Sequence, residues 1–269
     1  RQGTQMWSIV PPINQAWYNS SLVRDGEGWT RQERIIKAFK VLAAAGYTWE
    51  TPPVDAFGRI VPARGIRLPD GSPMAPFTIL TPPADYDPAR AISGTLIQQW
   101  LKAFGMPAAA RPMAFSALIQ EVKHRHRFDA FVMGYGRLSL DPDYLFSFFH
   151  SSQDKARGWN MSGYRNAVYD RLAERSRQEM DERRRRRIIF EMQRILVQDV
   201  PYVPLYRPRL IEAVRTDHFQ GWVPMLDGVS NIWTFCELWP VQAESSLRLL
   251  ESLQAKFRPS NGRRTNGIQ

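Results

Sequence analysis

Residues 128–136 read FDAFVMGYG, an apolar run that stops at a glycine–tyrosine–glycine turn. The Phe, Val and Met side chains of this run favour a short buried strand. Open α/β sheets bind their ligands in the loops that follow the carboxyl ends of strands. We therefore predict a buried strand over residues 128–133 and a candidate binding loop directly after it.

The segments before this strand predict the rest of an α/β lobe. Phe77–Thr81 is a run of β-formers, and helices are expected from Asp87 to about Phe104 and from Phe115 to about His124. The connector 106–112 has room for a short strand. The order strand, helix, helix, strand is typical of an α/β fold. The first helix has apolar side chains at four-residue steps, which predicts that this face packs on the sheet: Ile92, Leu96, Trp100 and Phe104.

Three more helices are marked by their boundaries and apolar faces. Thr30 and Glu33 form a capping-box pattern, and Gly46 can end the helix that begins there. Two longer helices are predicted over residues 166–179 and 181–199. The second of these has an apolar face that we expect to be buried: Ile188, Ile189, Met192, Ile195 and Leu196.

The C-terminal part of the chain has a different pattern. Residues 208–240 are expected to form strands and loops, and residues 241–269 a weakly helical, disordered basic tail. No stretch approaches 18 consecutive apolar residues, so we expect no membrane-spanning helix. The chain opens Arg-Gln-Gly, without Met or a basic-then-apolar leader, and we expect it to be a piece of a longer protein.

The formal net charge of +10 raises the possibility of nucleic-acid binding. The densest basic run, Arg183–Arg187, falls inside a predicted helix, where its side chains fan around the axis. It contains no aromatic residues of the kind that stack on single-stranded nucleic acid. We interpret the run as a solvated helix end and expect no nucleic-acid partner.

Motifs that carry catalysis or bind metals are missing from the sequence. There is no nucleophile elbow, phosphate-binding glycine loop or His-Glu-x-x-His motif. His124 and His126 stand two residues apart, but in a positively charged run that would repel cations, so no metal site is expected. Cys236 lies in an aromatic run and is expected to be buried and inert. We predict no cofactor and no nucleophile–base pair.

The loop after residue 133 has the residue types of a ligand site. Gly134 and Gly136 allow close approach of backbone to ligand, and Tyr135 offers a flat face and a hydroxyl. Arg137 is a bidentate donor for a carboxylate or phosphate. Asp141 could contact a ligand, but its place before Pro142 favours a helix-capping role. Two residues of the next long loop could complete the binding wall: Trp159 and Asn160.

A series of motifs resembles the substrate-binding proteins of ABC importers in the dipeptide, oligopeptide and nickel class. The motifs occur in order over about 200 residues and cover roughly residues 10–240. They are Lys37–Tyr47, Gly65–Arg67 with Gly71, Ile97–Leu101, Phe128-Asp129 with Gly134-Tyr135, Asp141-Pro142, Asn160 to Asp170, Gln193 with Val200–Tyr206, and finally Gly221-Trp222 with Ile232–Phe235 as closing strands.

This resemblance implies a partial two-lobe fold, with an α/β lobe of the periplasmic-binding-protein type II class. Proteins of this class are about twice as long, and the match is to their C-terminal half. Residues 1–207 would then be the second lobe and residues 208–240 a return segment to the first, whose N-terminal part is missing. Such proteins capture a solute by hinge closure and deliver it to a membrane permease. The implied location is periplasmic or otherwise extracytoplasmic.

The sequence departs from the peptide-binding members of this class at one position. Those proteins usually have an Asp a few residues after the glycine–aromatic pair, where it binds the terminal amine of the ligand. Here that position is Leu138, between Arg137 and Ser139. We therefore expect a solute without a free cationic amine, with Arg137 as a positive anchor.

An enzyme remains the alternative interpretation. A hydrolase or transferase could use Tyr135, Arg137 and Asp141 in an α/β cleft. The predicted site, on the binding interpretation, consists of Tyr135, Gly136, Arg137, Leu138, Ser139, Trp159 and Asn160.

Overall fold

The computed structural model describes residues 3–136, 138–225 and 228–241. The chain divides into two compact units. The larger unit spans Gln5–Tyr206, and the smaller one combines the N-terminal residues up to Thr4 with the chain from Arg207 onward. The candidate site residues all fall in the larger unit.

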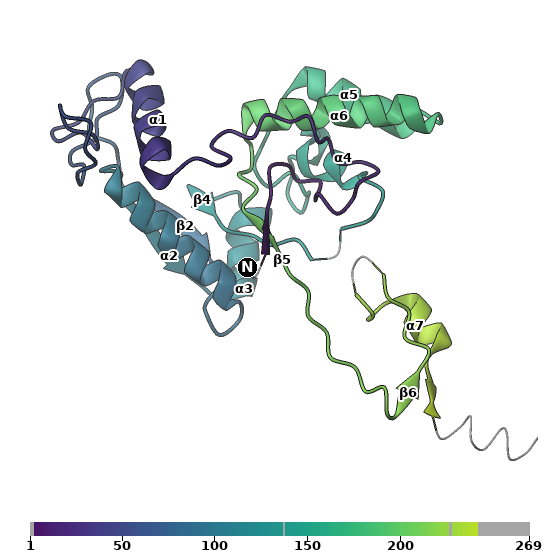
Figure 1. The fold of residues 1–269 in the computed structure, drawn as a ribbon. Coiled ribbons are helices and arrows are strands. Elements are labelled where there is room, and N and C mark those ends of the chain that lie inside the picture. Colours follow the sequence, from purple (N-terminus) through teal and green to yellow (C-terminus); the bar gives the residue numbers. More distant parts are fainter. Residues whose placement is uncertain (1–2, 137, 226–227, 242–269) are drawn as a thin grey trace, which may run out of the picture. The chain divides into compact units, whose positions relative to one another are not determined.

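A three-stranded parallel sheet lies in the larger unit, in the order β3-β2-β4 (Figure 1). Its strands are β2 (Phe77–Thr81), β3 (Ala108–Pro112) and β4 (Ala130–Phe131). Ile79 and Leu80 of the central strand are buried and pair with Ala130 and Phe131. The predicted α/β fold is thus confirmed, although β4 is shorter than the apolar run that predicted it.

Helix α2 (Pro88–Ala103) packs on this sheet through a face that the sequence analysis did not identify. Gly94 is buried, and a Cβ at this position would clash with the methyl group of Thr81. Ile97 and Leu101 pack beside it onto the core around Ile79. The prediction for the four-residue stripe was wrong, since three of its members are exposed: Ile92 by 57%, Leu96 by 39% and Trp100 by 54%.

One continuous helix in two parts leads from β3 to β4. Helix α3 (Phe115–Ile119) continues directly into one π-helical turn, η1 (Gln120–His124). Leu118 and Val122 of this continuous helix are fully buried and form a small core with Leu80 and Met161. The helix predicted here is confirmed, with a change of pitch in its second half.

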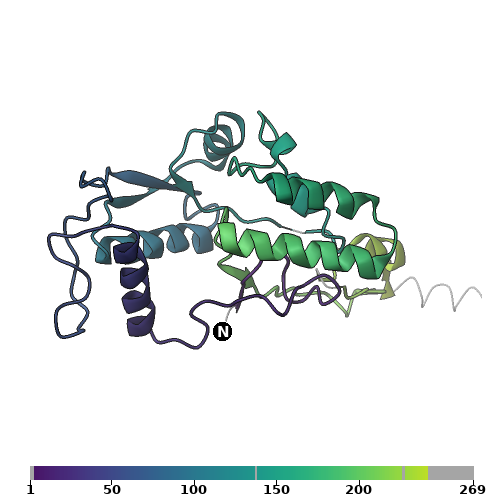
Figure 2. The ribbon, with the colours of Figure 1, turned by 90° about the horizontal axis from the view of Figure 1, so that it is seen from above.

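Helices α5 (Ala167–Gln178) and α6 (Glu182–Asp199) form a pair that lies side by side (Figures 1 and 2). Each begins at a side-chain cap, Asn166 for α5 and Asp181 for α6. With the short aromatic helix α4 (Tyr144–Phe149) they enclose the largest hydrophobic core among the residues that the structure describes. Its fully or nearly fully buried members include Leu145, Phe149, Tyr169, Ala173, Ile189 and Met192.

A buried amide ties the N-terminal segment to α6. Gln193 is fully buried, and its Oε1 accepts hydrogen bonds from Ser8 Oγ (3.0 Å) and Asn19 N (3.2 Å). Its Nε2 donates to the carbonyl of Trp17 at 2.8 Å. Gln193 therefore helps to hold residues 8–19, which form no regular element, on the helix, and Asn19 Nδ2 adds a hydrogen bond to the carbonyl of Phe190 at 3.2 Å.

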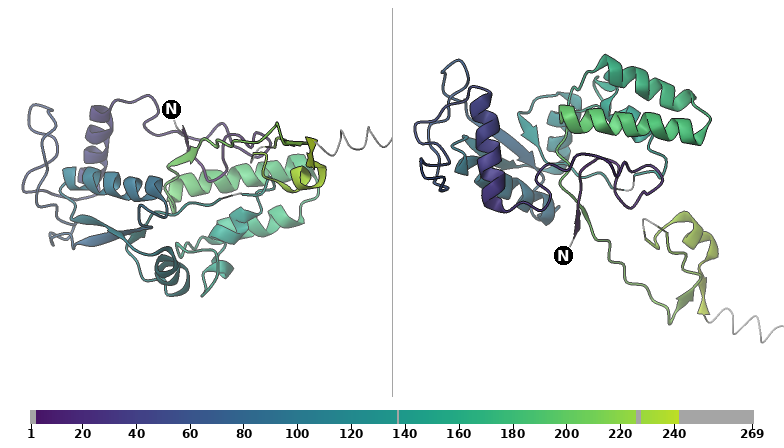
Figure 3. Two further views of the ribbon diagram at one scale, coloured as in Figure 1. Left: turned by 90° about the horizontal axis from the view of Figure 1, so that it is seen from below. Right: turned by 45° about the horizontal axis from the view of Figure 1, so that its top comes forward.

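Helix α1 (Arg31–Ala44), drawn in dark purple-blue in Figure 3, begins at a side-chain cap. None of its residues is buried. The predicted capping box is confirmed, because Thr30 and Glu33 exchange side-chain and backbone hydrogen bonds. Gly46 adopts the left-handed conformation (φ +91°) expected after a helix end. A groove of about 420 Å³ lies along this helix, with Trp7, Trp29 and Val41 among its lining residues.

The smaller unit contains short elements only. They are β1 (Gly3–Gln5) paired with β5 (Tyr206–Pro208), β6 (Phe219–Gln220) antiparallel to β7 (Trp239–Pro240), and α7 (Ile232–Glu237).

Two predictions for this unit were wrong. Residues 232–235, expected to be a strand, belong to α7, because Asn231 accepts a hydrogen bond from Thr234 N and caps a helix there. Cys236 is exposed rather than buried. Of the predicted tail, residues 241–269, all but residue 241 lie outside the described residues. Among the described helices, none is both long and apolar enough to cross a bilayer.

Candidate functional site

The loop after β4 begins with an aromatic side chain that is built into the core. The ring of Tyr135 stacks on Phe148 of α4, with 4.2 Å between the ring centroids. The Tyr135 hydroxyl donates to the hydroxyl of Tyr202 at 3.2 Å. Burial raises the pKa of Tyr135 far above its usual value, so this phenol stays neutral. Tyr135 is therefore a fixed, uncharged aromatic surface rather than a proton donor or acceptor.

Trp159 lies near the same point of the core, as the sequence suggested. Its ring centroid is 6.2 Å from that of Phe148, so one phenylalanine contacts both predicted aromatic residues. Trp159 remains 45% exposed, whereas Phe148 is buried. The structure thus brings Tyr135 and Trp159 together through α4, although 24 residues separate them.

A cation that the sequence analysis missed lies over Trp159. Lys123 Nζ is 3.3 Å from the centroid of the indole ring, which is a cation–π contact. Partial burial lowers the pKa of Lys123. Within the described residues no carboxylate forms an ion pair with Lys123. The contact depends on the π-helical turn η1, at whose end Lys123 lies, and no sequence signal revealed it.

The other residues of the predicted loop differ in their exposure. Leu138 is half-buried and packs against the core around α4, α5 and α6. Gly136 is exposed, and a Cβ placed there would contact nothing within 4 Å. Ser139 is exposed, and its hydroxyl accepts a hydrogen bond from Asp141 N at 3.2 Å. Arg137, the predicted anchor, lies outside the described residues.

Asn160 has a structural role that the sequence analysis did not assign to it. It is fully buried, and its Nδ2 donates to the carbonyls of His150 (3.2 Å) and Tyr164 (2.8 Å). Its Oδ1 accepts from Tyr164 N and Ser162 Oγ. Its donors and its acceptor are thus used within the protein, so Asn160 holds its loop together. Its role as a solute contact stays a prediction.

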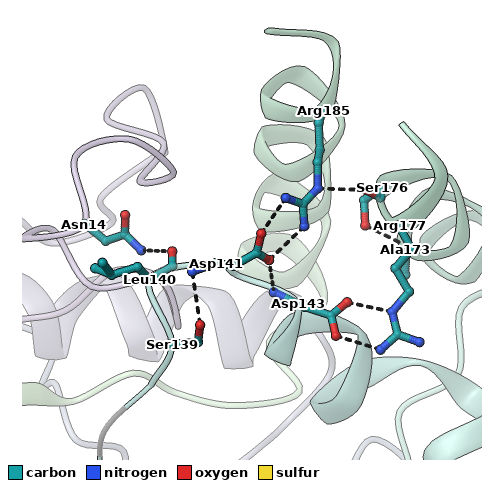
Figure 4. A network of polar contacts seen from close by, with 9 residues as sticks. All are labelled: Asn14, Ser139, Leu140, Asp141, Asp143, Ala173, Ser176, Arg177 and Arg185. Carbon is teal, nitrogen blue, oxygen red and sulfur yellow. Dashed lines mark hydrogen bonds and ion pairs between the residues drawn. The ribbon is translucent and has the colours of Figure 1, made fainter. Parts of the chain in front are cut away.

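Asp141 is not free to act as a catalyst or to bind a solute (Figure 4). Its carboxylate forms a bidentate pair with Arg185, at 2.6 and 2.8 Å. The hydrogen bond from Arg185 lowers the pKa of Asp141. Asp141 also accepts from Asp143 N at 3.0 Å, while Asp143 occupies the N-cap position of α4. Asp141 was predicted to cap this helix, but it lies two residues before the N-cap position, so the prediction is only approximately right.

Each acid between residues 129 and 143 is engaged by a neighbour. Asp143 pairs with Arg177 at 2.6 and 2.7 Å. Asp129 accepts hydrogen bonds from the backbone nitrogen and the hydroxyl of Thr78. Together with the Asp141–Arg185 pair, these contacts leave the loop without an unpaired carboxylate among its described residues.

The five-arginine run is more than a solvated helix end. The Arg185 side chain is only 19% exposed, and its guanidinium lies 5.1 Å from the centroid of Trp17. Arg184 and Arg186 form exposed ion pairs with Glu179 and Glu182. One residue of the run thus has a partly buried role, and two of its neighbours match the predicted surface role.

One serine–histidine contact exists despite the prediction that there is no nucleophile–base pair. Ser152 Oγ lies 2.8 Å from His150 Nδ1, in the short 3-10 helix η2 (Ser151–Gln153). The same ring nitrogen accepts a hydrogen bond from Ser152 N, so His150 serves as the cap of η2. The contact is explained by local capping and does not favour the enzyme interpretation.

Comparisons with known proteins confirm the resemblance seen in the sequence. No protein-family profile matches the chain. The oligopeptide-binding protein AppA of Bacillus subtilis is 32% identical over 114 residues, which are 42% of this chain and 20% of that protein. This is the sequence support for the resemblance.

Solved structures show that the fold is shared. AppA of Bacillus subtilis, bound to a nonapeptide, has a TM-score of 0.67 at 24% identity and covers 89% of this chain. A mannohexaose-bound oligopeptide-binding protein of Thermotoga maritima has a TM-score of 0.63 at 16% identity. NikZ of Campylobacter jejuni, bound to Ni(L-His), has a TM-score of 0.57 at 21% identity. The match to the Thermotoga protein covers 89% of this chain, and the match to NikZ covers 76%. It spans less than half of each neighbour: 43% of AppA, 44% of the Thermotoga protein and 38% of NikZ.

Proposed function

We propose that this chain is part of a solute-binding protein that captures a small polar or peptide-like solute for an ABC-type importer. The observation that carries the proposal is the fold match to peptide-bound AppA over 89% of the chain, together with the sequence match to the same protein. The larger unit would be the second lobe and the smaller one the return to the first. A membrane permease would receive the solute on the extracytoplasmic side.

The loop after β4 supports a binding surface in the larger unit. Tyr135 and Trp159 provide aromatic area that contacts Phe148. Gly136 and Ser139, which follow Tyr135 in the chain, are exposed. Aromatic surface with a few polar groups is typical of small-molecule sites. We propose Tyr135, Gly136, Ser139 and Trp159 as solute contacts, with Lys123 as a positively charged neighbour. Arg137 stays a proposed anchor on sequence grounds.

The paired acids favour a solute without a free cationic amine. A buried ammonium needs a carboxylate partner, and its desolvation costs several kcal/mol without one. Asp129, Asp141 and Asp143 are already engaged, and Leu138 occupies the position where an acid would be expected. Neutral or anionic solutes meet no such cost from this loop, and the cation of Lys123 favours the anionic ones. The neighbours were solved with a nonapeptide, mannohexaose and Ni(L-His), so the fold alone does not fix the solute.

The enzyme alternative receives no support from the residues first considered for it. Tyr135 is held neutral, and Asp141 is occupied by Arg185. A phenol with a raised pKa and a carboxylate already bound by a guanidinium are poorly matched to general acid–base catalysis near neutral pH.

Calorimetry on the full-length protein tests this proposal. The probes are pooled peptides of two to nine residues, the same pools N-acetylated, and neutral and phosphorylated sugars. We expect saturable binding of at least one pool, with acetylated peptides bound at least as tightly as free ones. No heat of binding from any pool would contradict solute capture. Tighter binding of free peptides would contradict only the proposed solute class.

A pair of tryptophan variants locates the site. Trp159→Ala should weaken binding at least tenfold, because it removes the exposed aromatic surface beside Lys123. The matched control is Trp100→Ala on the outer face of α2, a tryptophan of similar exposure (54%) that lies outside the proposed site. Equal effects of the two variants would remove Trp159 from the site.

A further inference from the structure

Two bidentate ion pairs join the end of the candidate loop to the helix pair (Figure 4). Arg185 of α6 binds Asp141 with both terminal nitrogens, at 2.6 and 2.8 Å. Arg177 of α5 binds Asp143 through Nε and Nη2, at 2.6 and 2.7 Å. Paired parallel hydrogen bonds fix both distance and orientation, which a single contact does not.

Both guanidinium groups are themselves held in place. Arg185 Nε donates to the carbonyl of Ser176 at 2.8 Å, so α5 supports the residue that α6 supplies. Arg177 lies over the ring of Phe146, 3.6 Å from its centroid. An arginine supported by an aromatic ring or a carbonyl has little freedom to follow a moving partner. We call the two ion pairs, Asp141–Arg185 and Asp143–Arg177, the clamp. The clamp is thus anchored at the end that the helices supply.

The segment that the clamp holds is the second half of the loop. Asp141 N donates to Ser139 Oγ, and Asn14 Nδ2 donates to the carbonyl of Leu140 at 2.8 Å. Leu138 packs into the core below. Residues 138–143 are therefore attached to α5, α6 and the N-terminal segment. Gly136, by contrast, is exposed, and a Cβ placed there would have no neighbour within 4 Å.

We propose that Arg185 and Arg177 are positioning residues for solute binding, acting through Asp141 and Asp143. This inference rests on the proposed function, since it assigns the clamp a role in that same site. The pairs set where Ser139 stands relative to Trp159. Because the carboxylates of Asp141 and Asp143 are 48% and 45% exposed, solvent screening keeps the contribution of these ion pairs to stability small, and their main effect is geometric. It acts without contacting the solute.

Hydrogen exchange measured by mass spectrometry tests whether the clamp holds the loop. Arg185→Gln and Arg177→Gln should raise exchange in residues 138–143 at least tenfold, with residues 188–196 of α6 unchanged. Arg185→Lys keeps the charge but loses the paired geometry, and it should fall between Arg185→Gln and the unaltered protein. Arg184→Gln is the matched control, because its ion pair with Glu179 does not reach the loop. Unchanged loop exchange in Arg185→Gln, or an equal rise in α6, would overturn the inference.

Calorimetry with the pooled peptides and sugars then separates the two proposals. We expect solute affinity to fall at least tenfold in Arg185→Gln, less in Arg185→Lys and not at all in Arg184→Gln. If the unaltered protein binds none of the probes, the proposed function fails. If it binds a probe and Arg185→Gln binds equally well, only the positioning role fails. Should Arg185→Gln not fold, Arg185→Lys and Asp141→Asn decide by the same two measurements.

Discussion

Helices α1 and α6 are both marked by clear end signals, yet they differ completely in what surrounds them. Each begins at a side-chain cap, Thr30 for α1 and Asp181 for α6. Helix α6 buries five of its residues, four of them in the core that it shares with α4 and α5, and α1 buries none. A cap and an apolar stripe specify where a helix forms, whereas stability comes from what the stripe packs against. The two helices should therefore respond differently to equivalent substitutions.

The largest expected effect is in the α6 core. Met192→Ala removes a side chain that is only 1% exposed and leaves a cavity, which should lower the free energy of unfolding by about 2–5 kcal/mol. The matched change in α1 is Val41→Ala, at a residue that is 54% exposed, and should stay within about 0.5 kcal/mol. Urea unfolding measures both. Similar losses in the two helices would show that α1 is covered as well as α6.

A smaller loss is expected when the buried amide of α6 is removed. Gln193→Leu leaves Ser8 Oγ, Asn19 N and the Trp17 carbonyl without their partner, at a cost of about 1–3 kcal/mol. Exchange in residues 8–19 should rise along with the loss of stability. The control is Gln99→Leu at an exposed position of α2, which should leave both the stability and the exchange in residues 8–19 unchanged. Loss of stability without faster exchange in residues 8–19 would contradict the role given to Gln193.

The α1 cap should have a local effect only. Thr30→Ala removes the capping hydrogen bond to Glu33 N, worth about 1 kcal/mol. Because α1 buries nothing, its ends can open without opening the core. We expect faster hydrogen exchange in residues 31–44 and an unchanged urea midpoint for the main transition. A shift of that midpoint by the full amount would mean that α1 unfolds together with α6.

The smallest effect is the pH dependence of the Asp141–Arg185 pair. The hydrogen bond from Arg185 lowers the pKa of Asp141 in the folded state, whereas the unfolded value is about 3.9. The pair's contribution is therefore present above about pH 4 and is lost as the pH falls through the folded pKa. Since the Asp141 side chain is 48% exposed, solvent screening keeps this contribution at or below about 1 kcal/mol.

Urea unfolding of Asp141→Asn and the unaltered protein at pH 7 and pH 3 checks this contribution. The difference between them should be larger at pH 7. A difference that grows toward pH 3 would show that the carboxylate is not stabilised by its partner.

Sequence reasoning succeeded where the signal was local. The Thr30 capping box, the two long helices α5 and α6 and the central strand β2 depend on residues a few positions apart. The face of α2 was mispredicted because the close approach at Gly94 is a property of the sheet below it. A stripe of large apolar residues is visible in a sequence, but a stripe that starts at a glycine is not.

The candidate site was less predictable than the fold for the same reason. Tyr135 and Trp159 were identified by residue type and position after a strand, and the structure joins them through Phe148. The Lys123–Trp159 contact and the Asp141–Arg185 pair join residues 36 and 44 positions apart. Pairings over such distances depend on tertiary arrangement, and no spacing within one element reveals them.

The Gln193 contacts also set an order of events during synthesis. Their partners Ser8 and Asn19 precede Gln193 by 185 and 174 residues. At about 5–20 residues per second, the ribosome needs roughly 10–35 seconds to add this length of chain. Residues 8–19 thus leave the ribosome long before the side chain that holds them exists. Because the closing of so long a loop is entropically costly, we expect this segment to join the domain late in folding.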